Sequence, residues 1–159
     1  MKLRYLFLFF VALVIGVSSC KKNSSVDPAK QAIIDDNLIK DFITKNNIPA
    51  TRLESGVYYQ IVSPGTGNFV YSDNATITAN YSGKLLNGTV FDKSKGTPIS
   101  LKLGEFIKGW RLGIPLIQKG GKIRLLIPSG YAYGENPPSN AIPVNSVLDF
   151  DVELVDVQN

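Results

Sequence analysis

The sequence predicts an α+β domain: one amphipathic helix, then a mostly antiparallel sheet crossed by one short helix. Two observations lead to this fold class. Residues 28–46 carry apolar side chains at helical spacing, whereas residues 56–159 contain short strand-like runs separated by Gly, Pro and Asn. With 159 residues, of which 44% are hydrophobic, the chain suffices for one domain of ordinary size and is too short for two sizeable ones.

The first residues have the features of a secretory leader. Two basic residues precede an unbroken apolar run over residues 5–17, and a helix of that length cannot cross a hydrocarbon core of about 30 Å. Two interpretations of the lone Cys20 remain: an incidental thiol behind a general signal peptide, or the acylated first residue of a mature lipoprotein. Because the tetrapeptide VSSC at residues 17–20 is similar to the bacterial lipobox, we favour the lipoprotein and expect residues 1–19 to be its signal peptide.

Residues 20–30 are polar and contain Ser, Asn and Pro, which is typical of a short tether. Acyl chains on Cys20 would hold this tether at a membrane, because each buried CH₂ group contributes about 0.8 kcal/mol. We therefore expect a lipid-anchored extracytoplasmic protein of a bacterial cell envelope, on the periplasmic face or at the cell surface.

A helix is expected over residues 28–46, most of which belongs to an N-terminal helical extension that spans residues 31–55. Asp27 is a suitable N-cap, Pro28 suits the first turn, and Pro49 follows the last apolar position of the pattern. Two interpretations stay open. Either the helix packs its apolar face on its own domain, which we favour, or that face binds a partner or a second copy.

Five runs predict strands, and alternation is clearest in the last one. There the apolar residues from Leu148 to Leu154 alternate with acidic ones, which predicts one apolar face and one wet, acidic face. The pair Asn87-Gly88 favours a two-residue hairpin turn, and residues 110–118 predict a short helix interrupted by a proline. The expected strands are residues 57–62, 75–83, 99–103, 122–128 and 147–157.

The composition excludes several kinds of chemistry. The chain has no histidine and one cysteine, which excludes imidazole acid–base catalysis, histidine-ligated zinc and an intrachain disulfide. We expect no metal and no cofactor. The net charge of +4 includes no basic block long enough to predict a nucleic-acid partner. Paired acidic residues such as Asp149 and Asp151 are more typical of a solvated face than of a glycosidase site.

Aromatic residues gather in the second half of the chain. Any one of these aromatic side chains, taken alone, is typical of a hydrophobic core. The polar tips of Trp and Tyr beside Gly-rich and Pro-rich loops also fit a concave pocket that opens at those loops, and the pattern leaves both interpretations open. The residues are Tyr81, Phe91, Phe106, Trp110, Tyr131, Tyr133 and Phe150.

Three segments resemble the FKBP-type peptidyl-prolyl cis-trans isomerases in order and in spacing: TANYSGKLLNGTVFDKS (78–94), LGEFIKGWRLGIP (103–115) and IPSGYAYGENPPSNAIPVNSVLDFDVEL (127–154). The similarity extends over residues 57–155, and the leader, tether and helix ahead of it resemble bacterial lipoprotein members of the family. The resemblance implies an FKBP-like antiparallel sheet wrapped around a short helix, with residues 56–159 as the isomerase domain.

The resemblance also implies a prolyl pocket between the short helix and the sheet. In it Trp110 lies under the proline ring, while the Ile107 backbone N–H and the Tyr133 hydroxyl donate to substrate carbonyls. Asp92 lies beside the pocket and is held by the Tyr81 hydroxyl. The implied catalytic residues are Tyr81, Asp92, Ile107 and Tyr133, and the implied substrate-binding residues are Phe91, Ile99, Phe106, Trp110, Ile142 and Phe150.

Two positions depart from the family pattern. Ile99 stands where many members carry a second Phe on the pocket wall, and Pro138 lies in a loop where some members have His. Ile99 keeps the wall apolar, and both departures bear on substrate preference and on affinity for macrolide inhibitors.

The implied function is the acceleration of Xaa-Pro bond rotation in unfolded or partly folded polypeptides outside the cytoplasm, which assists their folding. This reaction requires no nucleophile, metal or cofactor, because it makes and breaks no covalent bond. The alternative is a proline-binding chaperone or interaction module of the same fold with little turnover. The expected partners are proline-containing polypeptides, the membrane through the lipid anchor, and a macrolide inhibitor as a ligand.

Overall fold

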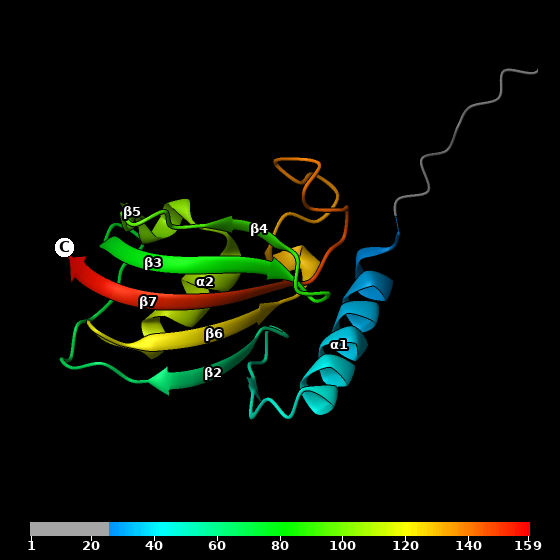
Figure 1. Cartoon of the computed structure of the whole chain (residues 1–159), viewed down its shortest axis with the longest axis horizontal. Helices are drawn as coiled ribbons and strands as arrows, with labels where there is room; N and C mark the ends of the chain where they lie inside the picture. Colours follow the sequence, from blue (N-terminus) through cyan, green and yellow to red (C-terminus); the bar gives the residue numbers. More distant parts are fainter. Residues whose placement is uncertain (1–25) are drawn as a thin grey trace, which may run out of the picture.

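Figure 1 shows a computed structural model of the chain, which describes residues 26–159. The expected signal peptide over residues 1–19, the expected acylated Cys20 and the first part of the tether lie outside the described residues. Within the described part, no helix is both long enough and apolar enough to cross a membrane.

Helix α1 (Pro28–Lys45) begins and ends close to the expected limits. The Asp27 carboxylate accepts a 2.9 Å hydrogen bond from the Ala29 N–H, and Pro28 occupies the first turn, where a missing N–H costs nothing. Beyond the other end, Asn47 has a φ of 52°, a left-handed conformation that Asn tolerates and that stops the helix.

Seven strands form one antiparallel sheet in the described part of the chain: β1 (Thr51–Arg52), β2 (Tyr58–Ser63), β3 (Thr76–Leu85), β4 (Val90–Lys93), β5 (Ile99–Lys102), β6 (Lys122–Ile127) and β7 (Leu148–Gln158). Their order is β1-β2-β6-β7-β3-β4, and β5 also pairs with β3. The C-terminal strand β7 therefore lies inside the sheet, between β6 and β3. The five expected strands are present with ends displaced by one or two residues, whereas the sequence pattern does not anticipate β1 and β4.

Two short strands share the outer edge of β3. Gly83 pairs with Asp92 of β4 near one end of β3, and Ala79 pairs with Ile99 of β5 near the other. Residues 94–98 connect the two short strands. This edge contributes residues from both strands to the site described below.

The hairpin between β3 and β4 differs from the expected two-residue turn. The Gly88 N–H donates to the Leu85 carbonyl (2.8 Å) and the Leu85 N–H donates to the Thr89 carbonyl (2.9 Å), so the loop contains residues 86–88. Of these, Gly88 alone has a positive φ (87°), whereas the expected turn requires positive φ at both central residues. Asn87 instead accepts a hydrogen bond from the Thr89 N–H with its side chain (3.0 Å).

The short helix begins and ends earlier than expected. Helix α2 covers Lys108–Gly113, and a 3₁₀ turn follows over Ile114–Leu116. Pro115 has no N–H with which to continue an α-helical ladder. Further along, the Gln118 N–H donates to the Pro64 carbonyl of a neighbouring loop (2.7 Å), so this segment already belongs to the connection to β6.

Helix α2 lies across one face of the sheet (Figure 1) and approaches it closely. Gly109 and Gly113 face the side chains of Ile127 and Leu125 on β6, and an added Cβ at either glycine would collide with those side chains. The close approach leaves Trp110 only 3% exposed. The main hydrophobic core fills the space between α2 and the sheet.

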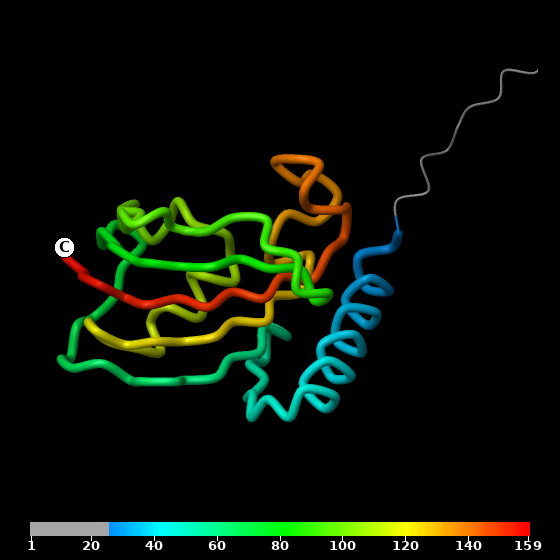
Figure 2. Tube along the Cα trace, in the orientation of Figure 1, coloured from blue at the N-terminus to red at the C-terminus, as the bar shows by residue number. Residues whose placement is uncertain are grey.

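A second, smaller apolar cluster lies between α1 and the sheet. Figure 2 shows α1 beside one end of the sheet and the C-terminus at the opposite end. The buried members of this cluster are Ile39, Tyr58, Leu126 and Val147. The helix therefore packs one face on its own domain, in agreement with the favoured interpretation, while three other apolar residues of α1 stay exposed: Ile33, Ile34 and Leu38.

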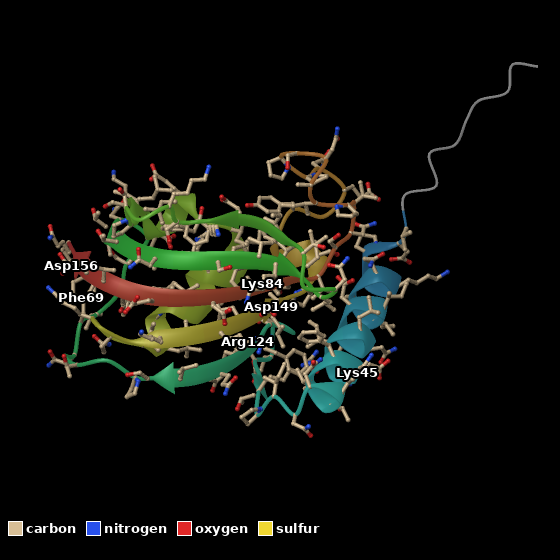
Figure 3. The ribbon with its side chains drawn as sticks, in the orientation of Figure 1. Lys45, Phe69, Lys84, Arg124, Asp149 and Asp156 are labelled. Atoms are coloured by element: carbon tan, nitrogen blue, oxygen red, sulfur yellow. The ribbon has the colours of Figure 1, made fainter. Side chains whose placement is uncertain are left out.

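The acidic face of β7 is not wholly wet. Asp149 is 2% exposed and accepts two hydrogen bonds from the Arg124 guanidinium on β6, at 2.9 and 2.7 Å. Figure 3 labels both residues near the end of the sheet that lies beside α1, and the same guanidinium lies over the ring of Phe42 in α1. The expectation of a wet face is wrong at Asp149, because α1 covers this end, and it is confirmed at the exposed Asp151.

Candidate active site

A cavity of about 230 Å³, which we call the aromatic cavity, opens between α2 and the sheet. It brings together residues that are far apart in the sequence and includes every expected site residue except Cys20 and Ile142. Its lining consists of Tyr81, Phe91, Asp92, Ile99, Leu101, Glu105, Phe106, Ile107, Trp110, Tyr133 and Phe150.

Trp110 of α2 forms the buried inner surface of this cavity. The ring of Phe106 stacks on it, with centroids 4.8 Å apart and an interplanar angle of 11°. Tyr81 and Phe150 meet the indole edge to face, at 5.6 and 5.5 Å. Stacked and edge-to-face pairs of this kind are the favoured aromatic geometries. The indole is thus held in a fixed orientation by neighbouring rings.

A glycine of β3 makes room for two rings of the wall. Phe91 and Phe150 lie edge to face with centroids 5.5 Å apart. Both rings reach over Gly83, where an added Cβ would lie 2.6 Å from Phe91 and 2.7 Å from Phe150. A side chain at this position would displace the rings and change the shape of the cavity.

Tyr81 and Asp92 meet across β3 and β4 at the cavity. The Tyr81 hydroxyl donates a 2.5 Å hydrogen bond to Asp92 Oδ2, the contact that the resemblance implies, and Asp92 Oδ1 accepts from the Lys93 N–H at 2.9 Å. Burial, followed by this hydrogen bond, raises the pKa of Tyr81 well above its usual value. The phenol is therefore protonated at physiological pH and acts as a donor to Asp92.

Two further donors face the cavity from opposite segments. Ile107 precedes the first turn of α2, and within residues 26–159 its backbone N–H donates to no protein group. Tyr133 is half-buried in the loop after β6, and no other side chain of the described part engages its hydroxyl. Burial, and then the charge of Asp92, raise the pKa of Tyr133, so this hydroxyl also stays protonated.

Ile142 is not among the residues that line the cavity. Its side chain is 4% exposed and belongs to the core cluster that also contains Trp110 and Phe150. The Ile142 N–H bonds to the Ser139 carbonyl (3.3 Å). Ile142 therefore belongs to the core rather than to the lining of the cavity.

Sequence reasoning missed two lining residues. Leu101 follows Ile99 at the two-residue period of a strand, so the pattern of β5 could have indicated that both share a face. Glu105 offers no such signal, because its position depends on the 3₁₀ turn before α2, where its carboxylate accepts from the Lys102 N–H (3.0 Å).

The two departures from the family pattern lie in different places. Ile99 lines the cavity, as expected, and supplies an aliphatic surface. Pro138 is exposed on the loop after Tyr133 and does not line the cavity. Only the first of them thus changes the cavity wall itself.

The arrangement favours a ligand that is apolar and carries carbonyl oxygens. The rings present an apolar surface, while two neutral donors, on Ile107 and Tyr133, remain available at the same cavity. Within residues 26–159, no group of three or more acidic, histidine or cysteine side chains is placed to hold a metal ion.

Comparison with known proteins gives one consistent result. Residues 70–155 match the family described as FKBP-type peptidyl-prolyl cis-trans isomerase. The protein named FKBP-type peptidyl-prolyl cis-trans isomerase FkpA from Buchnera aphidicola subsp. Schizaphis graminum is 47% identical over 111 residues, which are 69% of this chain and 44% of the relative. A probable FKBP-type peptidyl-prolyl cis-trans isomerase from Haemophilus influenzae is 38% identical over 148 residues, 92% of this chain and 59% of the relative.

A solved structure of similar fold is the 1.6 Å crystal structure of a peptidyl-prolyl cis-trans isomerase from Pseudomonas syringae pv. tomato. It has a TM-score of 0.68 and 29% sequence identity, and the match covers 84% of this chain and 98% of that one. The chain spans only about half the length of the two curated relatives, at 44% and 59%.

Proposed function

This chain belongs to the FKBP-type peptidyl-prolyl cis-trans isomerase family, and we propose that it accelerates cis-trans isomerisation of Xaa-Pro bonds in polypeptides that bind the aromatic cavity. The observation that carries the proposal is the cavity itself: Trp110 as an apolar floor, with the free Ile107 N–H and Tyr133 hydroxyl beside it.

The physics of the reaction suits these residues. Rotation about an Xaa-Pro bond breaks amide resonance, with a barrier of about 20 kcal/mol, and the planar amide is more dipolar than the twisted one. An apolar, water-poor cavity therefore disfavours the planar ground state relative to the twisted transition state. About 5–6 kcal/mol of such differential stabilisation would shorten a process of minutes to one of milliseconds.

We assign each group a role in this reaction. Trp110, with Phe91, Ile99, Phe106 and Phe150 around it, receives the proline ring and excludes water. The donors on Ile107 and Tyr133 bind substrate carbonyls, and they contribute to catalysis to the extent that these bonds strengthen as the amide twists.

The Tyr81–Asp92 pair fixes the polar edge of the cavity. Asp92 places a carboxylate near the hydroxyl of Tyr133, whose pKa its charge raises. This charge favours the protonated form of the second tyrosine and adds to the electrostatic field at the polar side of the cavity.

The rival function is a module that binds proline-containing segments without turning them over. A protease-free isomerisation assay on Xaa-Pro peptides, with and without a macrolide competitor, distinguishes the two. The proposal predicts that the protein accelerates isomerisation of the peptides. A macrolide that fits beside Ile99 should suppress this acceleration. A purified protein that binds the peptides but leaves the exchange rate unchanged would identify a binding module.

We further propose that the protein works outside the cytoplasm as a lipoprotein anchored through Cys20, with residues 1–19 as signal peptide, residues 20–30 as tether and residues 31–55 as helical extension ahead of the isomerase domain. The lipobox-like VSSC sequence supports this proposal. Its clients would be unfolded or partly folded envelope polypeptides. Cys20→Ala should move the protein from the membrane fraction to the soluble one, and unchanged fractionation would refute acylation.

A further inference from the structure

A second and larger cavity, which we call the helix groove, adjoins the aromatic cavity. It has a volume of about 700 Å³ and lies between the N-terminal half of α1 and residues 128–136. The two cavities share Phe106, Ile107 and Tyr133, so they form one continuous surface. In Figures 1 and 2 the N-terminal part of α1 lies beside the orange segment that follows β6.

The walls of the helix groove are mainly apolar. Pro28 and Ala32 line it from α1, and Tyr131 and Ala132 line it from the opposite segment. Charged groups also contribute, among them Lys108. A surface of this kind suits an extended polypeptide with apolar side chains better than a small charged ligand.

A buried carboxylate joins the two walls. Asp35 of α1 is fully buried, and its Oδ2 accepts hydrogen bonds from the Ser129 N–H (2.7 Å) and from the Ser129 hydroxyl (2.6 Å). Its Oδ1 accepts from Gln31 Nε2 (2.7 Å). Charge-assisted hydrogen bonds to a buried acceptor are among the stronger ones in proteins. The width of the groove is therefore set before any ligand arrives, which lowers the entropic cost of binding.

We propose, on the basis of the isomerase function above, that the helix groove is a second subsite that binds the substrate residues flanking the proline. The aromatic cavity, at about 230 Å³, is too small for more than a short part of a polypeptide, so the rest of a bound chain must continue along the adjoining surface. The shared residues Phe106, Ile107 and Tyr133 make the helix groove such a continuation. The N-terminal helix thus takes part in selecting longer, apolar-flanked substrates.

The test compares two peptides with the same Xaa-Pro core: a blocked tetrapeptide, and an uncharged peptide of about twelve residues, long enough at about 3.3 Å per residue to extend beyond the aromatic cavity. Ala32→Arg places a long charged side chain at the wall of the groove, and Ala32 is exposed, so the fold tolerates it. Asn37→Arg is the matched control, because Asn37 is exposed on α1 and does not line the groove. Cis-trans exchange is measured by NMR for the full-length protein and both variants.

The proposal predicts that Ala32→Arg lowers kcat/KM for the long peptide at least about fivefold, through KM, because uniform binding is lost, while the tetrapeptide is unaffected. Asn37→Arg should match the wild type on both substrates. Equal loss on both peptides, or no loss on either, overturns the subsite. A wild type with equal kcat/KM for the two peptides also overturns the subsite. This result is expected when another segment of the chain or a second copy fills the groove.

Failure of the isomerase function would look different. A wild-type protein that accelerates neither peptide contradicts the proposed function. The peptide affinities, read from the fluorescence of the lone Trp110, then decide the subsite, because both Arg variants leave Trp110 as the single tryptophan. Tighter binding of the long peptide that Ala32→Arg abolishes supports the groove, and equal affinity for both peptides rejects it.

Discussion

The Tyr81 hydroxyl donates a 2.5 Å hydrogen bond to Oδ2 of Asp92 across two neighbouring strands of the sheet. The backbone of Tyr81 is itself held on both sides by Ser94, whose hydroxyl accepts from the Tyr81 N–H (2.8 Å) and whose N–H donates to the Tyr81 carbonyl (3.0 Å). The tyrosine ring is at the same time in edge contact with Trp110. Tyr81 therefore contacts both the polar edge of the cavity, at Asp92, and its aromatic floor, at Trp110.

Removal of the carboxylate should weaken catalysis more than stability. We expect Asp92→Ala to lower kcat/KM on a tetrapeptide about tenfold, because Tyr81 loses its hydrogen-bond partner and Tyr133 loses the negative charge that acts on its hydroxyl. Exposed Asp92 carries little of the core, so circular dichroism should show a native fold. Asp151→Ala removes an exposed carboxylate elsewhere on the sheet and should retain full activity. Equal activity of the two variants would mean that Asp92 has no role in the site.

The donor role of Tyr133 can be isolated by removing one atom. Tyr133→Phe keeps the half-buried ring and deletes the hydroxyl, so we expect kcat to fall about tenfold or more with little change in KM, as for donors that act mainly in the transition state. Tyr59→Phe, on β2, provides the control. Unchanged kcat in Tyr133→Phe would assign carbonyl binding to Ile107 alone.

The packing of α2 on β6 leads to a stability prediction with an unusual sign. In an ordinary helix, Gly→Ala stabilises by up to about 1 kcal/mol. Gly109→Ala should instead destabilise by about 1–3 kcal/mol, because the new Cβ collides with Ile127 and α2 must move off the sheet. Gly130→Ala, where an added Cβ meets nothing within 4 Å, should be close to neutral. Urea unfolding of both variants measures the difference, and a stabilised Gly109→Ala would contradict the close approach.

The attachment of α1 should weaken in acid. The hydrogen bond from Lys40 (2.7 Å), helped by Arg52 and Tyr58, lowers the pKa of Asp36 to about 2. An Asp in the unfolded chain titrates near pH 3.9, so the folded state gains stability from ionised Asp36 above about pH 4. That contribution is lost as the pH falls from about 4 to about 2.

Asp36→Asn removes the titrating carboxylate and with it this pH dependence. The variant is therefore the reference with which the wild type is compared at each pH. The difference in unfolding free energy between the wild type and Asp36→Asn should be largest at pH 5 and shrink towards zero at pH 2. A difference that is constant over this range would show that the carboxylate charge does not stabilise the fold.

Much of the fold and site follows from local sequence. Strand alternation, the Asp27 and Pro28 helix start and the aromatic motifs each depend on neighbours close in the chain, and the structure agrees with them. The sequence left open whether the aromatic residues form a core or a pocket, and in the structure some of them do both. Trp110 and Phe150 are buried in the core and also line the cavity.

The differences arise where distant segments meet. Asp149 looks solvated from its own strand, and is buried only because α1, far away in the sequence, covers that end of the sheet beside Arg124. Ile142 lies in a long connection whose turn directs its side chain into the core. The helix groove forms where α1 lies beside residues 128–136. Because these segments are far apart in the sequence, no local pattern predicts the groove.

The most direct test of the central claim is the cis-trans exchange rate of an Xaa-Pro tetrapeptide, measured by NMR with the protein in substoichiometric amount. The cavity geometry predicts exchange that rises in proportion to protein concentration and that Tyr133→Phe reduces. Exchange that stays at the uncatalysed rate while Trp110 fluorescence reports peptide binding would contradict catalysis and leave a binding protein of the same fold.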